Sequence, residues 1–502
     1  MRRRRSTPLA TEDLARRCEA YLEAVNREEY LFASGLKKET DLPEIEAAYA
    51  DLASPSSVMA VRKALEKATG EPALRLLGLL NFLIDLLAEA HVAPTQNRFY
   101  AAQGKVNLKI QKKTLPFRRS QAALAAEPDR LVRLLIGSEQ HRVFAKLNPL
   151  LLESLKTTHE LSARLNRGGH VALCGRRLGV DLKGLGEAAA KLLADTREIY
   201  VESMERSARQ RLGLALDDLR REDMAFFLGG TEFDSHFPEG TMAATAEGIQ
   251  KGLGLDPTVG GRIAYDLEDR KGKSHRACAY PIRVPEEIVV TLRPKPGHAA
   301  LRQFLQQVGE AMHRATTDPT LPFEFRGLAA PSVIQASGHL FGRMLLDQGW
   351  LASRSGLAAH LEALRQSVAL KEAYFIRLLA TQFRYELVLH SDGSFERKDV
   401  IFSDMIQEHC SVRFAPEAYL YFTDFHFHTA VYLRGLLLES LLRRRLRERF
   451  GEKWRLKKEA GGFLRDIWKG GGRISHSDAL ERLGGREYDF SPLVEDLKGL
   501  FA

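Results

Sequence analysis

The stretch FLQQVGEAMH at residues 304–313, together with EFRGLAAPSVIQ at residues 324–335, decides the fold prediction. In the first stretch Gln306, Glu310 and His313 are four and three positions apart, so a helix places them on one face. The opposite stripe is apolar and is expected to be buried, with Leu301, Leu305, Val308 and Met312 as its residues. Taken alone, this pattern is explained by an ordinary amphipathic helix with a solvated polar side.

The composition is that of a soluble globular protein. The chain has 502 residues, of which 44% are hydrophobic and 28% are charged, enough for a large core in two lobes or more. The cysteines Cys18, Cys174, Cys278 and Cys410 are far apart and form no C-x-x-C pair. This argues against a disulfide framework or a cysteine zinc site and favours a cytoplasmic location. The basic start at Arg2–Arg5 is not followed by an apolar stretch, so no signal peptide is expected.

Charge and hydropathy exclude two classes of partner. The net charge is +9, but basic and acidic residues alternate along the predicted helices, as on ordinary solvated faces. No basic stripe with interleaved aromatic residues is present, so nucleic acid is not an expected partner. The most apolar window, Leu74–Leu87, is interrupted by Arg75, Asn81 and Asp85. It predicts a buried core helix and no membrane span.

Helical periodicity dominates the chain, and two stretches are expected to form strands. The sequence suggests a helical N-terminal lobe at residues 1–200 and a second domain at residues 201–502. The first predicted strand region, 276–292, is rich in β-branched residues and contains Pro281 and Pro285. The second, 385–395, carries the turn signal Asp392-Gly393.

The two opening stretches resemble the active-site helices of the oligoendopeptidase F and thimet oligopeptidase group of zinc metallopeptidases. In that group the first helix carries His-Glu-x-Gly-His, usually with a further His, and the second carries a Glu ligand after a Pro-Ser step. Gly309 and His313 match the first pattern. The resemblance implies a mainly α, zincin-like, two-lobed oligopeptidase fold, with a small β-sheet beside the motif helix and a central cleft. In such enzymes a strand near the motif helix binds substrate backbone as an added strand.

Further stretches fit the same family in the same order. Residues 265–273 (YDLEDRKGK) resemble its Asp-x-x-x-Arg-x-Gly-Lys lead-in. Residues 428–435 (HTAVYLRG), 447–454 (RERFGEKW) and 461–468 (GGFLRDIW) resemble its C-terminal segments. In the first of these, His428 stands where the family usually has an aromatic residue.

The positions that perform the chemistry in the family are changed in this chain. Gln306 replaces the first His ligand, Gln307 the general-base Glu, Glu310 the second His, and Gln335 the Glu ligand. A Gln amide is a weak, uncharged metal donor and cannot accept a proton from a zinc-bound water. The resemblance therefore predicts a degenerate site without zinc and without another cofactor.

Three functional hypotheses follow. The first is a non-catalytic oligopeptidase-like protein, a pseudoenzyme whose cleft binds a peptide or protein partner. The second is an enzyme of altered chemistry that uses a cleft lined by Glu310, His313, His339, His428 and Tyr432. The third is a metallopeptidase with ligands elsewhere in the chain. Glu310 and His313 also have the Glu-x-x-His spacing of di-iron bundles, but no second such pair lies nearby. The oligomeric state stays open.

Overall fold

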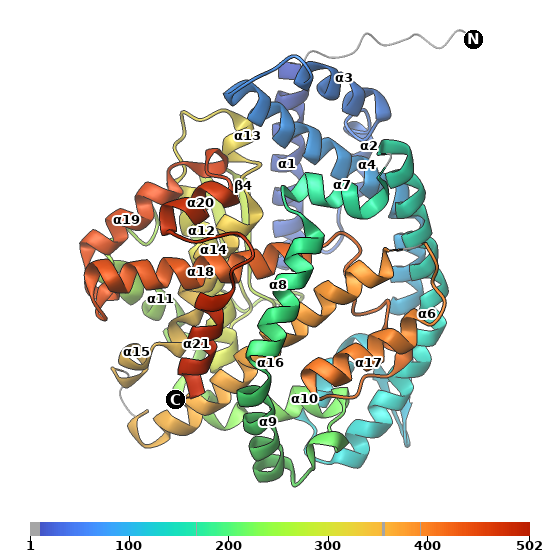
Figure 1. The fold of residues 1–502 in the computed structure, drawn as a ribbon, viewed down its shortest axis with the longest axis vertical. Helices are drawn as coiled ribbons and strands as arrows, with labels where there is room; N and C mark the ends of the chain where they lie inside the picture. Colours follow the sequence, from blue (N-terminus) through green and yellow to red (C-terminus); the bar gives the residue numbers. More distant parts are fainter. Residues whose placement is uncertain (1–10, 167, 354–356, 392, 502) are drawn as a thin grey trace. The chain divides into compact units, whose positions relative to one another are not determined.

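The computed structural model describes residues 11–166, 168–353, 357–391 and 393–501, and it is mainly helical, with 70% helix and 5% strand (Figure 1). The predicted class, mainly α with small sheets, is confirmed. The predicted basic start at Arg2–Arg5 and the turn residue Asp392 lie outside the described residues.

Contacts divide the chain into two compact units built from alternating segments. Unit 1 comprises residues 1–90, 234–353 and 438–487, and unit 2 comprises residues 91–233, 354–437 and 488–502. The division falls inside the helices α4 (Glu71–Gly104) and α18 (His428–Phe450). It does not follow the boundary that the sequence suggests at residue 200, and that boundary stays a prediction.

Each unit has its own set of elements. Unit 1 contains α1 (Thr11–Ala33), α2 (Leu42–Ala48), α3 (Pro55–Leu65), β3 (Ile263–Asp266), β4 (Cys278–Arg283), β5 (Glu287–Thr291), α11 (Met242–Gly252), α12 (His298–Thr316), α13 (Phe323–Arg326), α14 (Pro331–Gly342), α15 (Gln348–Ala352), α19 (Lys458–Trp468) and α20 (His476–Leu483). Unit 2 contains β1 (Asn107–Ile110), β2 (Lys113–Pro116), α5 (Ser120–Ala126), α6 (Arg130–Leu165), α7 (Gly169–Leu178), α8 (Leu182–Asp195), α9 (Arg197–Leu212), α10 (Arg221–Phe227), α16 (Leu361–Leu389), α17 (Lys398–Cys410) and α21 (Ser491–Phe501).

The sheet of unit 1 has the strand order β3-β5-β4. β5 runs parallel to β3 and antiparallel to β4, with Tyr280 opposite Val289. The central strand β5 is buried along Ile288–Thr291, which explains its continuous apolar run. Pro281 lies in β4, at an edge of the sheet, where the missing N–H costs no ladder hydrogen bond. The strand prediction for residues 276–292 is therefore confirmed, with Pro285 between the two strands.

The two motif helices follow the sheet directly. In α12 the expected stripe Leu301, Leu305, Val308 and Met312 is buried. α12 packs against β4, β5 and α14, so the small sheet lies beside the motif helix as predicted. Proline is favoured at the first position of a helix because its absent N–H has no helical partner there, and α14 begins at Pro331.

The strand predicted at residues 385–395 is wrong, because α16 continues to Leu389. Tyr385, Glu386 and Leu389 are buried and lie on one side of the helix at spacings of one and four. Packing of α16 against α8 and α17 supplies this burial within unit 2. The turn signal Asp392-Gly393 suggested the strand, but a turn signal does not fix the conformation of the residues before it, and tertiary contacts decide the conformation of short apolar runs.

Among the described residues, α4 is the one helix long and apolar enough to cross a membrane. Its most apolar 18-residue window has a mean hydropathy of 1.6, and 39% of that window is buried. A core helix of a soluble protein meets the same criteria, so this is weak evidence for a span. Leu79, Leu83 and Leu87 are buried at helical spacing, and the core-helix assignment stays a prediction.

Candidate functional site

Helices α12 and α14 pack closely because each presents a glycine to the other. A Cβ atom added to Gly309 of α12 would lie 2.3 Å from the carbonyl oxygen of Ser337 in α14. A Cβ atom added to Gly338 of α14 would lie 2.8 Å from Cγ of Glu310. Both distances are shorter than real Cβ contacts, so a larger residue at either position would push the helices apart. The predicted packing of the two motif helices is confirmed.

Four polar side chains of these helices form one hydrogen-bonded group, here called the amide cluster. Gln306 Nε2 donates to Glu310 Oε1 and to Gln335 Oε1, at 3.4 Å in each case. Gln307 Nε2 donates to the same Glu310 oxygen at 3.2 Å. Gln307 Oε1 accepts the backbone N–H of Ala279 in β4 at 2.8 Å. The structure thus brings together the four positions that the motif comparison singled out.

Glu310 is the buried member of the amide cluster, with 8% of its surface exposed. The three glutamines around it are partly exposed. Burial raises the pKa of Glu310, and the charge of Arg314 and the hydrogen bonds from Gln306 and Gln307 offset this only in part. The cluster is therefore an array of neutral amides around one carboxyl group that ionises reluctantly.

His313 lies in the packed interior of unit 1, with 1% exposure. Its Nδ1 is 3.0 Å from Ser337 Oγ, and Trp468 Nε1 donates to the same hydroxyl at 2.9 Å. Burial lowers the pKa of His313 to about 3, and the charge of Arg314 adds to this, so the imidazole is neutral at pH 7. The Ser337 hydroxyl of α14 thus contacts side chains of both α12 and α19.

His339 is also in the interior of unit 1, with 3% exposure. It lies on the last turn of α14, near the buried ion pair of Arg343 with Glu439. Burial would raise the pKa of Glu439, but the nearby cations lower it overall. His339 thus belongs to a charged, buried contact between α14 and the part of α18 in unit 1.

The remaining predicted site residues, His428 and Tyr432, belong to unit 2 and lie one turn apart on α18. His428 Nδ1 is 2.9 Å from Asp424 Oδ2. Asp424 also accepts the backbone N–H groups of His426 and His428, at 2.7 and 3.0 Å. A carboxylate at a helix start satisfies N–H groups that lack helical partners, so Asp424 caps α18. His428 is oriented by this cap.

The outer edge of β4 is covered by side chains from two helices of unit 1. Ala279 N–H is taken by Gln307, and the Pro281 carbonyl accepts from Asn26 Nδ2 of α1 at 2.9 Å. Residues two apart on a strand direct their backbone groups to the same side. An extended peptide that pairs with this edge therefore has to replace Gln307 and Asn26.

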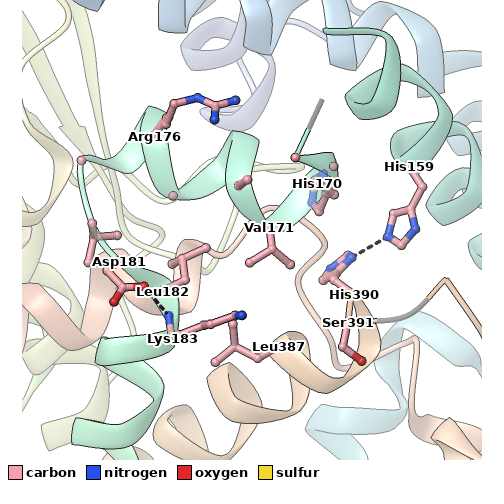
Figure 2. A pocket seen from close by; sticks show the side chains of 16 residues that line it. His159, His170, Val171, Arg176, Asp181, Leu182, Lys183, Leu387, His390 and Ser391 are labelled. Carbon is pink, nitrogen blue, oxygen red and sulfur yellow. Dashed lines mark hydrogen bonds between the residues drawn. The ribbon is translucent and has the colours of Figure 1, made fainter. Parts of the chain in front are cut away.

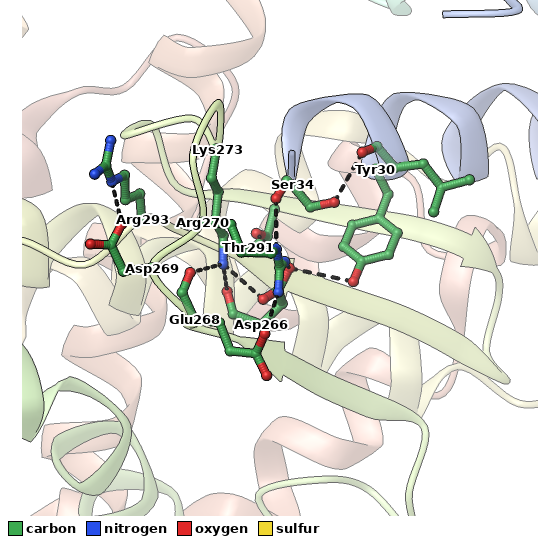
Figure 3. A network of polar contacts seen from close by, with 10 residues as sticks. Tyr30, Ser34, Asp266, Glu268, Asp269, Arg270, Lys273, Thr291 and Arg293 are labelled. Atoms are coloured by element: carbon green, nitrogen blue, oxygen red, sulfur yellow. Dashed lines mark hydrogen bonds and ion pairs between the residues drawn. The ribbon is translucent and has the colours of Figure 1, made fainter. Parts of the chain in front are cut away.

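The segment that resembles the family's lead-in forms a buried ionic network after β3 (Figure 3). Lys273 Nζ donates to Asp266 Oδ1 at 2.8 Å and to the Asp266 carbonyl at 2.7 Å. Arg270 pairs with the other carboxylate oxygen, which also accepts from Thr291 at 3.3 Å. Burial would raise the pKa of Asp266, but hydrogen bonds from Lys273 and Arg270 lower it overall. The charged residues of this segment therefore stabilise the loop that follows β3.

The donor atoms of the amide cluster do not fit a catalytic zinc ion. Such a site needs three ligands such as imidazole or carboxylate, and the ligand positions here offer one carboxyl group and two amides. No group of three or more His, Cys, Asp or Glu side chains within residues 11–166, 168–353, 357–391 and 393–501 is arranged to hold a metal ion. The absence of zinc from the protein stays a prediction.

A group of histidines in unit 2 was not foreseen from the sequence. His159 Nε2 and His390 Nδ1 are hydrogen-bonded at 2.7 Å, and the rings of His170 and His390 have centroids 4.6 Å apart. His170 also bonds the Ser162 hydroxyl at 2.8 Å and the Phe425 carbonyl at 2.7 Å. These residues are separated by up to 231 positions in the chain, and no motif spacing connects them.

Burial sets the charge of these histidines. It lowers the pKa of His170 to about 3, and it lowers the pKa of His159 and His390 as well. The ring of His426 lies 6.0 Å from that of His170, centroid to centroid, and burial lowers its pKa to about 4. Arg177 and the other imidazoles add to the lowering, while Asp424 opposes it at His426 and His390. The group is therefore made of neutral imidazoles at pH 7.

Comparisons with known proteins give no relative. No protein-family model matches the chain, and no curated protein shows significant similarity to it. The resemblance to zinc oligopeptidases therefore rests on the motifs and stays a prediction.

Proposed function

We propose that this protein is a non-catalytic relative of the zinc oligopeptidases that binds a peptide or protein partner at the amide cluster and the adjoining edge of β4. The two-lobed zincin-like fold and the cytoplasmic location belong to the same proposal. The observation that carries it is the pair of hydrogen bonds by which Gln306 joins Glu310 and Gln335. Amides satisfy one another at the positions where the resembled enzymes carry metal ligands.

The chemistry of the cluster supports binding over hydrolysis. Neutral amides supply neither the charge that polarises a scissile carbonyl nor a base that accepts a proton from water. Side-chain amides do have the donors and acceptors of a peptide group. A partner in extended conformation would exchange the Gln307 and Asn26 hydrogen bonds at β4 for its own backbone bonds. This exchange keeps the hydrogen-bond number nearly constant, so affinity would come from side-chain contacts.

The alternative of an enzyme with altered chemistry receives less support. Its candidate residues His313 and His339 are buried in unit 1 and already engaged with Ser337 and with the neighbourhood of Glu439. A general base must reach the proton that it abstracts, and a packed interior does not offer that access. The non-catalytic function is therefore the proposal that the geometry favours.

The proposal is tested by binding and hydrolysis assays on one set of peptides. The probe is a fluorescent decapeptide library of random sequence, measured by anisotropy for binding and by chromatography for cleavage, with equimolar zinc present. We expect binding without cleavage, and weaker binding by Gln335→Ala. Gln303→Ala is the matched control, because Gln303 is exposed on α12 outside the cluster. Cleavage that a zinc chelator abolishes, or binding that Gln335→Ala leaves unchanged, would contradict the proposal.

A further inference from the structure

Unit 2 contains a pocket that the proposed function does not use. It has a volume of about 870 Å³ and lies between α7, the start of α8 and the end of α16 (Figure 2). A volume of this size is within the range of small-molecule sites in proteins. Val171, Leu182 and Leu387 supply apolar wall, and His159, His170 and His390 supply polar wall.

One of the lining residues has an unused hydrogen-bonding atom. His390 is 6% exposed, and its Nδ1 is bonded to His159. Its Nε2 is buried and has no hydrogen-bond partner among the described residues. Leaving a buried polar atom without a partner is unfavourable, because the atom has lost its hydrogen bonds to water. A ligand that bonds this atom would replace a lost hydrogen bond.

Two further features favour an anion in the same pocket. Helix α7 starts at the pocket wall, where Gly168 provides no side-chain cap for the N–H groups of the first turn. Such N–H groups and the helix dipole attract negative charge. Lys183 lines the pocket from α8, forms no ion pair with the described residues, and extends in Figure 2 toward the side where His390 lies. In the same view the side chain of Arg176 extends away from Lys183 and His390.

We propose that this pocket binds a small organic phosphate. The phosphate group accepts hydrogen bonds from the first turn of α7 and from His390, and Lys183 balances its charge. The organic part occupies the remaining volume against Val171, Leu182 and Leu387. A tetrahedral phosphate suits this wall because its several oxygens accept from donors in different directions at the same time.

The neutral state of the histidines is consistent with this arrangement. A neutral imidazole whose Nδ1 accepts from His159 carries its proton on Nε2, and that N–H is then a donor for a phosphate oxygen. The buried donor needs no charge of its own, because Lys183 and the start of α7 provide positive charge. The Asp181 carboxylate in the lining is engaged with the backbone N–H groups of Lys183 and Gly184 at the start of α8. The site therefore works without protonating the buried imidazoles.

The test is isothermal titration of the full-length protein with phenyl phosphate and with inorganic phosphate, at constant ionic strength set by chloride. We expect saturable binding of both, with phenyl phosphate tighter because its ring contacts the apolar wall. Lys183→Gln, at an exposed position, should weaken binding roughly tenfold, because the cation that balances the phosphate charge is lost. His390→Gln should weaken it as well, with its fold checked by circular dichroism.

The matched control is Lys191→Gln, which removes an exposed lysine from the same helix, outside the pocket lining. It should bind phenyl phosphate like the parent. The proposal is overturned if the parent binds neither probe above the chloride background. It is equally overturned if Lys183→Gln binds as tightly as the parent, or if Lys191→Gln loses as much affinity as Lys183→Gln.

Discussion

Gln306 Nε2 lies 3.4 Å from Gln335 Oε1, and this contact joins α12 to α14. The resembled peptidases carry metal ligands at these two positions, on two helices that must approach closely. In this chain Gly309 and Gly338 allow the close approach, and the side chains at the two ligand positions, Gln306 and Gln335, are neutral amides. The close packing of two helices and the chemistry of the side chains between them are thus separable features of the sequence.

The helix contact predicts the effect of a single methyl group. Gly309→Ala places a Cβ atom 2.3 Å from the Ser337 carbonyl, so α12 and α14 must shift. We expect a loss of roughly 1–3 kcal/mol in the free energy of unfolding, as for other overpacked contacts. Gly248→Ala on α11 is the control, because its Cβ meets nothing within 4 Å and helix propensity alone should stabilise it. Urea denaturation measures both, and equal stability of the two variants would refute the contact.

The ionic network after β3 predicts that replacing Lys273 strongly lowers the free energy of unfolding. Lys273→Met leaves the Asp266 carboxylate with Arg270 as its remaining cation in a largely buried place. Breaking a buried ion pair costs roughly 3–5 kcal/mol because one charge stays uncompensated. Lys271→Met, two positions away and exposed, should change little. Chemical denaturation at pH 7 measures the free energy of unfolding of both variants. If Lys273→Met loses less of it than the control does, the network does not stabilise the fold.

The buried histidines of unit 2 predict acid sensitivity. Burial lowers the pKa of His170 from 6.5 to about 3, so between these values the unfolded chain binds more protons than the folded one. Stability therefore falls as the pH falls through this window, by about 1.4 kcal/mol per pH unit for each such histidine. His170→Gln should reduce the slope of stability against pH between 6 and 4, whereas His91→Gln, at an exposed position, should not. Denaturation curves at several pH values give the slopes, and an unchanged slope for His170→Gln would contradict the assignment.

The spacing of apolar residues along the chain predicted the helix and the strands around the amide cluster. The apolar stripe predicted the buried face of α12, which consists of Leu301, Leu305, Val308 and Met312. The β-branched run before it predicted the strands β4 and β5. The segment 385–395 was interpreted as a strand because it carries the turn signal Asp392-Gly393. Contacts of α16 with α8 and α17, more than a hundred and about twenty positions away in sequence, select the helix there.

The candidate site was predictable where one helix carries it and unpredictable where the tertiary structure assembles it. Spacing placed Gln306 and Glu310 on one face, and the structure shows them hydrogen-bonded. No pattern indicated that the Gln307 amide would bond the Ala279 backbone, because that contact depends on the sheet. For the same reason His159 and His390 could not be paired from the sequence.

The most direct test of the central claim is the zinc content of the protein after dialysis, measured by elemental analysis beside a variant with the ligands restored. The variant combines Gln306→His, Gln307→Glu, Glu310→His and Gln335→Glu, and metal affinity should follow ligand identity on a preserved backbone. We predict negligible zinc in the parent and near one zinc per chain in the folded variant. Near one zinc per chain in the parent, or a folded variant that binds zinc no better than the parent, would contradict the account.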